Sequence, residues 1–305
     1  MALMEKNKWL SILSLLASLM IWGASFIATR VATAAFSPIL LGVVRFFASA
    51  LVLMIVSFLQ RKPVRIAPQD YKAVFITGLF GITIYYTIEN YGVAMTSAGN
   101  AAVITAIYPI TTLLLGVLFF HDHVSLRQII GILLAVLGIA VLTASPIGEG
   151  GRKAWIGNIL LLANGFNWGL YNYMTQSISR ETDTASLTLM QSVIASFCSL
   201  PLLAFDLPIT VGPLTPAVIF SLLFLVIGCS SAAYYLYNFA LRGVSAGTAA
   251  AMVNLMPVFG LFFAWSILHE KISSTQLLGS AIVLFGVFLS TVPVSFFHSS
   301  PQKTS

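Results

Sequence analysis

Long apolar stretches, separated by short polar connections, dominate the 305 residues of this chain. Charged residues make up only 8% of the sequence, whereas a soluble globular domain carries about 25%. So few charges cannot cover a surface that faces water, and the chain is therefore expected to fold within a lipid bilayer. In such a protein the excess of 15 Lys and Arg over 9 Asp and Glu belongs in cytoplasmic loops and does not indicate a nucleic-acid partner.

Ten apolar stretches have about the 20 residues that a helix needs to cross a bilayer. Barrel strands are shorter and alternate apolar with polar residues, which these stretches do not. The sequence therefore predicts an all-α membrane protein with ten transmembrane helices. The predicted spans cover residues 10–30, 38–59, 72–94, 98–120, 125–144, 154–176, 185–206, 214–240, 246–268 and 274–295.

The distribution of Lys and Arg predicts the orientation of these spans. The first apolar run follows a basic start, as in a signal peptide, but it continues to Ala28 without a convincing cleavage site and is interpreted as a span. With the N-terminus inside, ten basic residues fall in inner segments and four in outer ones. Both termini are therefore expected in the cytoplasm. The lack of a targeting segment favours a multi-pass protein of a bacterial inner membrane.

The two halves of the chain repeat one another. "LLASLMIWG" at residues 15–23 matches "LLANGFNWG" at residues 161–169, and "SAGNAA" at residues 97–102 matches "SAGTAA" at residues 245–250. Between residues 97 and 141, 12 of 45 positions are identical to those 148 residues later, without a gap. Further matching pairs are Tyr86 with Tyr234, Asn90 with Asn238, Pro109 with Pro257, Gly131 with Gly279, and Gly138 with Gly286.

Each repeat holds five predicted spans, and an odd number forces the second repeat into the membrane the other way up. The first repeat is predicted over residues 10–144 and the second over residues 154–295. Inverted-topology repeats are typical of secondary transporters, whose substrate site lies near the midplane between the two repeats. The alternative is a duplication that merely builds a larger bundle.

Both halves resemble the EamA domain of the drug/metabolite transporter superfamily. The first half does so in "WGASF", "RFFASALVLMI" and the stretch from "YGVAMTSAGN" to "GILLAVLGIAVL", and the second in the stretch from "LRGVSAGTAAAMVNLMP" to "GSAIVLFGVFLS". The resemblance covers residues 12 to 293. It implies a bundle of two inverted halves that exports small metabolites such as amino acids. It also implies a central cavity lined by the first, third, fourth, sixth, eighth and ninth spans.

Two ionisable residues lie well inside predicted spans, where such residues are functional candidates. Glu89 in the third span and Arg45 in the second lie at similar depths, about 8–10 Å below the outer edge. One interpretation is a buried structural ion pair. The other is that Glu89 titrates during transport or holds a substrate amine. At the corresponding positions the second half has Tyr237 and Gln191, so the charged pair belongs to one half only.

Aromatic and amide side chains on the same spans form a second candidate group. Such residues can simply join helices, at about 1 kcal/mol or less each. As a group they suit a substrate with an apolar body and polar ends, because phenols and amides supply both donors and acceptors. The predicted substrate-binding residues are Trp22, Tyr85, Tyr86, Glu89, Asn90, Tyr108, Asn164, Asn167, Trp168, Tyr171, Tyr234, Asn238 and Asn254.

The middle of two spans carries a proline, and no motif indicates a cofactor. Pro109 and Pro257 each free a backbone carbonyl and invite a kink, so both are candidate gating hinges. The "HDH" sequence at residues 121–123 lacks further ligands, and no metal site is expected. The chain has no GxxxxGK[ST] motif for ATP hydrolysis.

These features together predict a secondary transporter, not an enzyme, that exports a small organic metabolite such as an amino acid by alternating access. Transport is expected either to be coupled to a proton gradient through Glu89 or to be uncoupled facilitated diffusion. A multidrug or cation exporter and an uptake permease of the same fold remain alternatives. A non-transporting membrane sensor or a membrane enzyme is a weaker one, because catalytic side chains do not cluster. The expected partners are a small-molecule substrate and the bilayer, with the chain as a monomer or homodimer.

Overall fold

The computed structural model describes residues 2–96, 101, 104–105, 108–120, 125–143, 151–207, 209, 211–268 and 272–291. Within these ranges nearly every segment is helical, and the only extended pairing is a single bridge between Phe36 and Val211. The all-helical prediction is therefore confirmed for the described residues. The "HDH" sequence lies outside them, as do residues 97–100 of "SAGNAA".

The helices of the first half follow the predicted spans closely, because each begins or ends at a proline, a glycine or a polar connection. The second and third spans are joined by a short 3-10 helix, and the third contains one π-helical stretch. The elements are α1 (Ala2–Ala32), α2 (Pro38–Leu59), η1 (Pro68–Asp70), α3 (Tyr71–Gly78), π-helical η2 (Leu79–Ile84), α4 (Tyr85–Met95), α6 (Tyr108–Phe119) and α7 (Leu126–Thr143).

The second half has corresponding elements in the same order. Its third span also contains a π-helical stretch, and Pro201 ends its second helix earlier than predicted, with a 3-10 helix in place of the last turns. The elements are α8 (Gly151–Ser177), α9 (Thr184–Ser199), η4 (Pro201–Asp206), α10 (Pro216–Leu223), π-helical η5 (Phe224–Ala233), α11 (Tyr234–Ala240), α12 (Ala246–Met252), α13 (Leu255–Leu268) and α14 (Ser274–Thr291).

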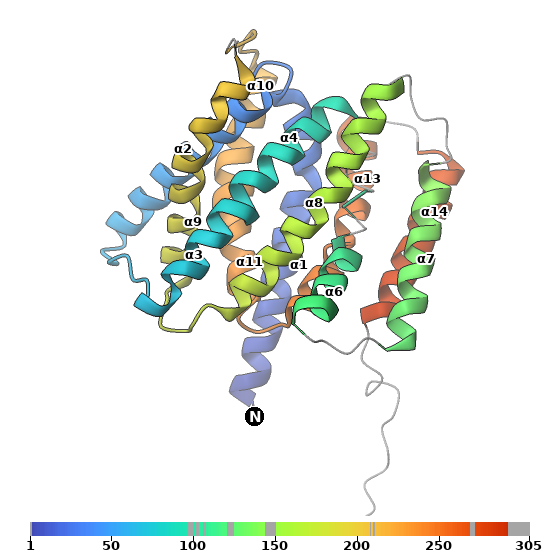
Figure 1. Ribbon diagram of the computed structural model, residues 1–305, viewed down its shortest axis with the longest axis horizontal. Helices are drawn as coiled ribbons and strands as arrows, with labels where there is room; N and C mark the ends of the chain where they lie inside the picture. Colours follow the sequence, from blue (N-terminus) through green and yellow to red (C-terminus); the bar gives the residue numbers. More distant parts are fainter. Residues whose placement is uncertain are drawn as a thin grey trace, which may run out of the picture.

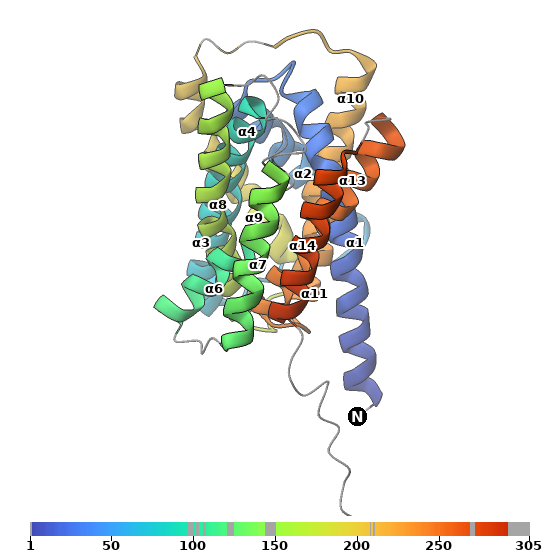
Figure 2. The same cartoon turned by 90° about the vertical axis from the view of Figure 1, so that its right-hand side faces the viewer.

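The helices lie lengthwise in one bundle (Figure 1). Helix α1 rises from the N-terminus at the bottom of the view, whereas α8 descends from the top. Helix α1 packs against η5, α11 and α13, and α8 packs against α4 and α6. Helices α7 and α14 form a pair at the right-hand side of Figure 1, and this pair faces the viewer in Figure 2.

Four of the described helical segments are long and apolar enough to cross a membrane, judged by length and composition. They are Trp9–Ala32, Pro38–Leu59, Pro68–Met95 and Pro216–Ala240, and they coincide with the predicted first, second, third and eighth spans. Large apolar side chains such as Phe58, Leu59 and Phe220 are exposed along them, as expected of surfaces that face lipid. The predicted total of ten spans stays a prediction.

One of the two candidate hinge prolines, Pro257, lies at a helix start and not in the middle of a continuous helix. The predicted ninth span is divided into α12 and α13 by a turn at Val253 and Asn254, and Pro257 stands in the first turn of α13. Pro109 is the second residue of α6. A proline has no amide hydrogen to donate and its ring clashes with the carbonyl four residues earlier, so it is tolerated best in a first helical turn. The predicted mid-helix kink at Pro257 is therefore corrected to the start of a new helix, whereas the kink at Pro109 stays a prediction, because residues 106–107 lie outside the described residues.

Repeated glycines bring α7 and α14 into close contact. A Cβ atom added at Gly138 would lie 2.7 Å from the backbone nitrogen of Val283 and 2.9 Å from the carbonyl oxygen of Gly279. A Cβ atom at Gly286 would meet the backbone of Gly131 and Ala135 equally closely. The two helices thus pack backbone to backbone, which only small residues permit.

Replacing Gly138 by alanine is expected to lower the melting temperature of the detergent-solubilised protein. Because the atoms it would meet are backbone atoms, α7 and α14 must separate, at a cost of about 1–3 kcal/mol or roughly 3–10 °C in melting temperature. Gly247→Ala is the matched control, since a Cβ atom there has no neighbour within 4 Å. Equal melting temperatures for the two variants, measured by circular dichroism, would contradict the close packing.

Buried or partly buried aspartates join the two halves at both ends of the bundle. At the end where the N-terminus lies, the Asp70 carboxylate accepts hydrogen bonds from the amide (3.1 Å) and hydroxyl (2.7 Å) of Ser179 and from the hydroxyl of Thr182 (2.5 Å). Burial raises the pKa of Asp70, but these hydrogen bonds outweigh it and hold the pKa below its ordinary value of 3.8.

At the opposite end of the bundle, Asp206 also joins the two halves by accepting hydrogen bonds. Its carboxylate accepts hydrogen bonds from the amides of Ile39 (2.8 Å) and Leu40 (3.1 Å) in the first turn of α2, and from the Tyr91 hydroxyl (2.5 Å). A carboxylate is favoured there by the positive end of the helix dipole. In each case an aspartate that precedes the third span of one half holds the start or approach of the second span of the other half.

The stability of the protein is expected to depend on the ionisation of Asp70. Because its native pKa is lowered, its contribution is complete above pH 3.8 and is lost as the pH falls through the lower native value. Asp70→Asn should therefore reduce the melting temperature at pH 7 and flatten its decline between about pH 5 and pH 2.

Glu181→Gln is the control for Asp70→Asn, because Glu181 is exposed at the same end and its carboxylate accepts a hydrogen bond from the exposed side chain of Gln69. An exposed pair of this kind contributes about 0–1 kcal/mol. Identical pH profiles for the wild type and Asp70→Asn would show that Asp70 does not stabilise the fold as a carboxylate.

Candidate functional site

The two repeated tryptophans meet at the centre of the bundle. The rings of Trp22 on α1 and Trp168 on α8 lie edge to face, with centroids 5.4 Å apart. Tyr234 and Tyr237 of the eighth span lie 5.1 and 5.0 Å from Trp22. The Trp22 indole donates to the carbonyl oxygen of Cys229 at 3.1 Å, which fixes the ring. Each contact of this geometry adds about 0.5–1.5 kcal/mol beyond area burial, so the cluster is a rigid centre.

The glycine after each tryptophan brings its helix against a helix of the other half. A Cβ atom at Gly23 would lie 2.6 Å from the Cβ atom of Phe259 on α13, and one at Gly169 would lie 3.0 Å from the Cα atom of Thr112 on α6. The Trp-Gly sequence therefore does two things. Its glycine permits close helix packing, and its tryptophan is directed into the centre.

A small enclosed cavity of about 20 Å³ lies beside the two tryptophans. This is about the space that one water needs, whereas pockets for metabolites usually measure about 300–1,000 Å³. The structure is thus closed around its centre. The lining comes from the first, third, fourth, sixth and ninth predicted spans, and consists of Trp22, Ser25, Phe26, Tyr85, Tyr86, Glu89, Thr105, Tyr108, Trp168, Val253 and Met256.

The buried charges Glu89 and Arg45 occupy different positions relative to this cavity. Glu89 lines it and is 4% exposed. Arg45 is fully buried behind Tyr86, with its Cζ atom 4.2 Å from the centroid of the Tyr86 ring. Its Nε atom donates to the hydroxyl of Ser230 at 2.5 Å. Neither Nη atom of Arg45 is hydrogen-bonded to any described residue, so the structure contains no hydrogen-bonded Arg45–Glu89 pair.

The position of Gln191 in the second half corresponds to that of Arg45, and its side chain is fully bonded. Its amide nitrogen donates to the hydroxyl of Thr77 at 2.9 Å, and its amide oxygen accepts from the amide of Asn238 at 2.9 Å. One repeat thus fills this position with a satisfied neutral amide. The other fills it with a buried cation that has two unmatched nitrogen atoms, an arrangement that normally costs stability.

A layer of phenols and amides lies below the tryptophans. The Tyr171 hydroxyl donates to the Asn238 amide oxygen at 2.5 Å, and the Asn238 amide nitrogen donates to Thr188 at 3.0 Å. The Tyr237 hydroxyl donates to the Asn172 amide oxygen at 2.6 Å. All five side chains are at most 1% exposed. We name Tyr171, Asn172, Gln191, Tyr237 and Asn238 the amide layer.

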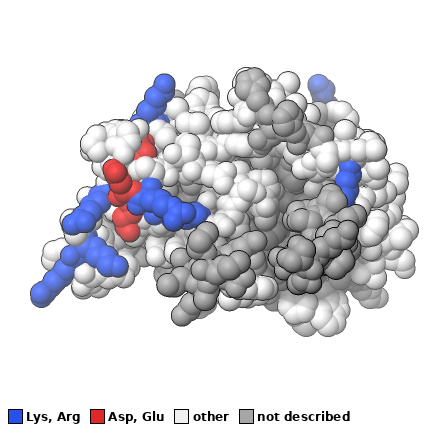
Figure 3. All heavy atoms as spheres, turned by 90° about the horizontal axis from the view of Figure 1, so that it is seen from below, with Lys and Arg blue, Asp and Glu red and all other residues white. Residues whose placement is uncertain are grey.

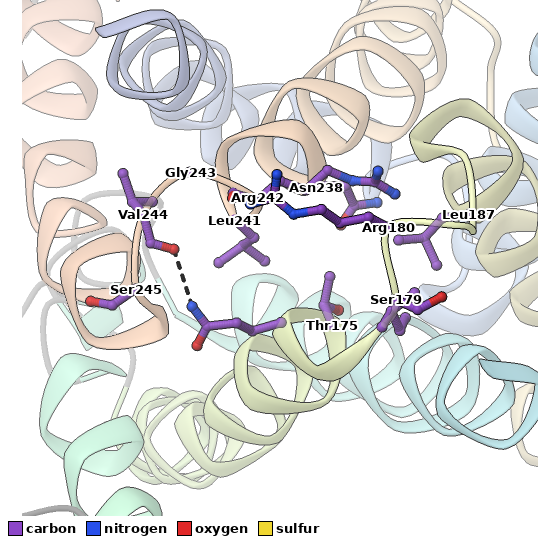
Figure 4. Close-up of a pocket in the computed structure, with 12 residues that line it drawn as sticks. Thr175, Ser179, Arg180, Leu187, Asn238, Leu241, Arg242, Gly243, Val244 and Ser245 are labelled. Carbon is purple, nitrogen blue, oxygen red and sulfur yellow. Dashed lines mark hydrogen bonds between the residues drawn. The ribbon is translucent and has the colours of Figure 1, made fainter. Parts of the chain in front are cut away.

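An open pocket of about 450 Å³ lies on the far side of the amide layer, where α8 and α11 end (Figure 4). Asn238 belongs both to the amide layer and to the lining of this pocket. Viewed from this end, the molecule gathers basic and acidic side chains in one region of the surface (Figure 3). We name the pocket the vestibule. It is lined by Thr175, Gln176, Ile178, Ser179, Arg180, Leu187, Asn238, Leu241, Arg242, Gly243, Val244 and Ser245.

Three predicted site residues bond helices or each other instead of lining the cavity. The amide of Asn90 donates to the carbonyl of Pro38 at 2.9 Å, and that of Asn164 donates to the carbonyl of Tyr85 at 3.0 Å. Asn167 donates to the Asn164 amide oxygen at 3.1 Å. None of these three asparagines is among the residues that line the cavity. Asn254 is buried in the turn between α12 and α13, and its amide has no hydrogen bond to a described residue.

The structure also adds residues that the sequence did not single out. Tyr237 contacts both tryptophan rings, at 5.0 and 5.1 Å, and its position matches that of Glu89 in the repeat. That match was the one signal that pointed to it. Ser25, Phe26 and Ser230 carried no such signal, because a small or apolar residue in a span usually only packs.

Comparison with known proteins identifies the family. Residues 9–144 and 155–292 both match the EamA-like transporter family. The chain belongs to this family. An uncharacterized transporter of Archaeoglobus fulgidus is 26% identical over 278 residues, which cover 90% of this chain and 94% of that protein. The uncharacterized transporter YoaV of Bacillus subtilis is 22% identical, with 93% and 97% covered.

A plant protein and a solved structure are also similar. The WAT1-related protein At3g02690 of Arabidopsis thaliana, described as chloroplastic, is 25% identical over 285 residues, covering 89% of this transporter and 67% of that protein. One solved structure superposes with a TM-score of 0.72 at 17% identity and covers 93% of this chain and 98% of that one. At that identity the likeness establishes the fold alone.

Substitution by methionine is expected to affect the melting temperature differently at the repeat-related positions Arg45 and Gln191. Arg45→Met removes a buried cation with unmatched nitrogen atoms, so the melting temperature should stay within about 2 °C of wild type or rise. Gln191→Met removes the partners of Asn238 and Thr77 and should cost about 1–3 kcal/mol. Thermal unfolding of both variants in the same detergent measures the difference.

Arg45→Met could also destabilise the protein because it leaves the buried charge of Glu89 without a cation nearby. The double variant Arg45→Met/Glu89→Gln removes both buried charges and therefore tests whether Arg45 itself stabilises the fold. A double variant that is less stable than Gln191→Met would show that Arg45 is held for structural reasons.

Proposed function

We propose that this EamA-family protein is a secondary transporter that exports small organic metabolites, amino acids or similar compounds, by alternating access. The observation that carries the proposal is the closed aromatic cavity with one buried carboxylate in its wall and one buried, incompletely bonded guanidinium behind it. A bilayer protein that keeps both charges in its interior does so at a cost, and a substrate with complementary charges would account for their retention.

The proposal includes two inverted five-helix repeats over residues 10–144 and 154–295, with ten spans in total. Three observations support it. The repeat-related residues Trp22 and Trp168 touch each other. The glycines of α7 and α14 make exchanged contacts, Gly131 with Gly286 and Gly138 with Gly279, as a two-fold axis between the helices requires. The related helices α1 and α8 also run in opposite directions (Figure 1).

Alternating access is supported by the closed state of the centre. The cavity is too small for a metabolite, and the hydrogen-bonded amide layer lies between it and the vestibule. A substrate that reaches the cavity from the vestibule must therefore separate Tyr171 from Asn238. The break before Pro257 is a point at which α13 can change its angle, and Pro109 in the first turn of the described part of α6 is the second proposed hinge.

The proposed binding residues divide by role. The rings of Trp22, Trp168 and Tyr86 would hold an apolar or aromatic body, and Glu89 would hold an ammonium group. Coupling to protons would act through Glu89. A cationic drug is the second candidate substrate, because Glu89 lines the cavity whereas Arg45 lies behind Tyr86. We place the protein in a bacterial inner membrane with both termini in the cytoplasm, acting as a monomer or homodimer.

The deciding experiment is transport by the reconstituted protein. Purified protein in liposomes is tested with labelled amino acids and cationic drugs, with and without a pH gradient. Glu89→Gln keeps the shape of the side chain but cannot ionise. It should abolish the pH-dependent part of transport, while the free energy of unfolding changes by less than about 1 kcal/mol.

Glu181→Gln serves as the control, because it removes one exposed carboxylate at the surface without touching the cavity. Unchanged flux and unchanged pH response in Glu89→Gln would exclude the role of Glu89. The absence of flux for every compound, in protein that is folded by circular dichroism, would overturn the proposal that the protein is an exporter of such metabolites.

A further inference from the structure

The vestibule carries two arginines and no carboxylate in its wall. Arg180, from the connection after α8, and Arg242, from the turn after α11, both line it. The two side chains lie along the same wall of the pocket (Figure 4). None of the 12 lining residues is Asp or Glu. Two like charges therefore share one concave space, and an anion bound between them would relieve their repulsion.

The nearby acidic residues are engaged elsewhere. Asp70 uses its carboxylate to accept hydrogen bonds from Ser179 and Thr182. Asp183 caps α9 and accepts from the amides of Ala185 and Ser186, each at 3.1 Å. Both carboxylates lie near enough to Arg242 to raise its pKa, but burial and the charge of Arg180 act in the opposite direction, and the pKa is lowered.

The guanidinium groups keep donors available. An arginine offers five N–H donors in a planar fork that matches a carboxylate. Arg242 donates through Nη2 to the carbonyl oxygen of Thr182, and Arg180 donates through Nη2 to the carbonyl oxygen of Arg242 at 3.4 Å. Apart from these backbone contacts, no hydrogen bond from either guanidinium to another described residue is present in the structure.

We propose that the vestibule binds the carboxylate group of a small soluble metabolite, held by Arg180 and Arg242. The volume of about 450 Å³ is in the range of pockets that hold small molecules. The proposal rests on the proposed function, because it treats the vestibule as a first binding site for the transported substrate, next to the amide layer. Asn238, at the inner end of the pocket, is the first member of that layer that the bound molecule meets.

Cysteine labelling tests the proposal without any knowledge of the substrate. Ile178 lines the vestibule and makes no side-chain hydrogen bond, so Ile178→Cys places a thiol inside it. The background variant is Cys198→Ser, which retains the buried Cys229 as an unreactive thiol. The rates of modification by an anionic (sulfonatoethyl) and a cationic (trimethylammonium-ethyl) methanethiosulfonate are compared at low salt, each corrected for its reaction with free cysteine.

The anionic reagent should react about tenfold faster than the cationic one in Ile178→Cys. Adding Arg180→Gln should lower this preference about threefold, and adding Arg242→Lys should leave it nearly intact because the charge is kept. Arg65→Gln is the matched control, since Arg65 is exposed at the same end but does not line the vestibule. No preference for the anion, or an equal effect of Arg65→Gln, would overturn the proposal.

Protection from labelling identifies the ligand chemistry. Benzoate at millimolar concentration should slow modification of Ile178→Cys at least twofold, and benzylamine of the same size should not. Arg180→Gln should abolish the protection. Inorganic phosphate that protects as well as benzoate would overturn the assignment to a carboxylate. The labelling needs no transport, so its failure is distinguishable from the absence of flux that would overturn the proposed function.

Discussion

The absence of hydrogen-bonding partners in hydrocarbon is the constraint on which this structure depends. A polar group within a membrane protein must find its partner inside the bundle, and most polar side chains here do so. Ser49 bonds Ser231, Thr83 bonds the carbonyl of Gly78, and Tyr171 bonds Asn238. The same constraint makes the unmatched nitrogen atoms of Arg45 informative. Some neutral side chains, such as Ser18 and Asn254, also keep an unmatched buried polar atom, but an unmatched charged group costs more than a neutral one, which makes Arg45 the strongest candidate for a role other than stability.

The differences between the two halves carry more functional information than their likeness. The shared features are the tryptophan pair, the close glycine contacts and the aspartates at the two ends, and they build the scaffold. The positions of Arg45 and Glu89 correspond to those of Gln191 and Tyr237 in the other half. There the second half builds the neutral amide layer. The first half therefore places charged side chains near the centre, and the second half supplies the hydrogen-bonded amide layer next to it. The two related halves of the scaffold thus differ in the charge that they place near the centre.

Periodicity and the repeat predicted much of this arrangement. The four spans that meet the length and composition criterion agree with the predicted ranges within a few residues, because apolar length is a direct property of the sequence. The contact of Trp22 with Trp168 could be expected once the repeat was recognised. The break before Pro257 was missed, since a proline is compatible with a kink or with a new helix start, and only the backbone decides between them.

The site was less predictable, for reasons that follow from how side chains reach one another. Depth along two spans places Arg45 and Glu89 at the same level, but it does not give the direction of either side chain around its helix. The guanidinium of Arg45 lies against the ring of Tyr86, and the face of this ring stabilises part of the positive charge in place of a carboxylate. The vestibule was harder still to anticipate. Arg180 and Arg242 lie in separate connections, where a basic residue ordinarily reports only the side of the membrane. Their meeting depends on the loops that Asp70 and Asp183 fix. Asp70, a residue without a place in the transport pathway, therefore helps to determine where a negatively charged substrate would first be held.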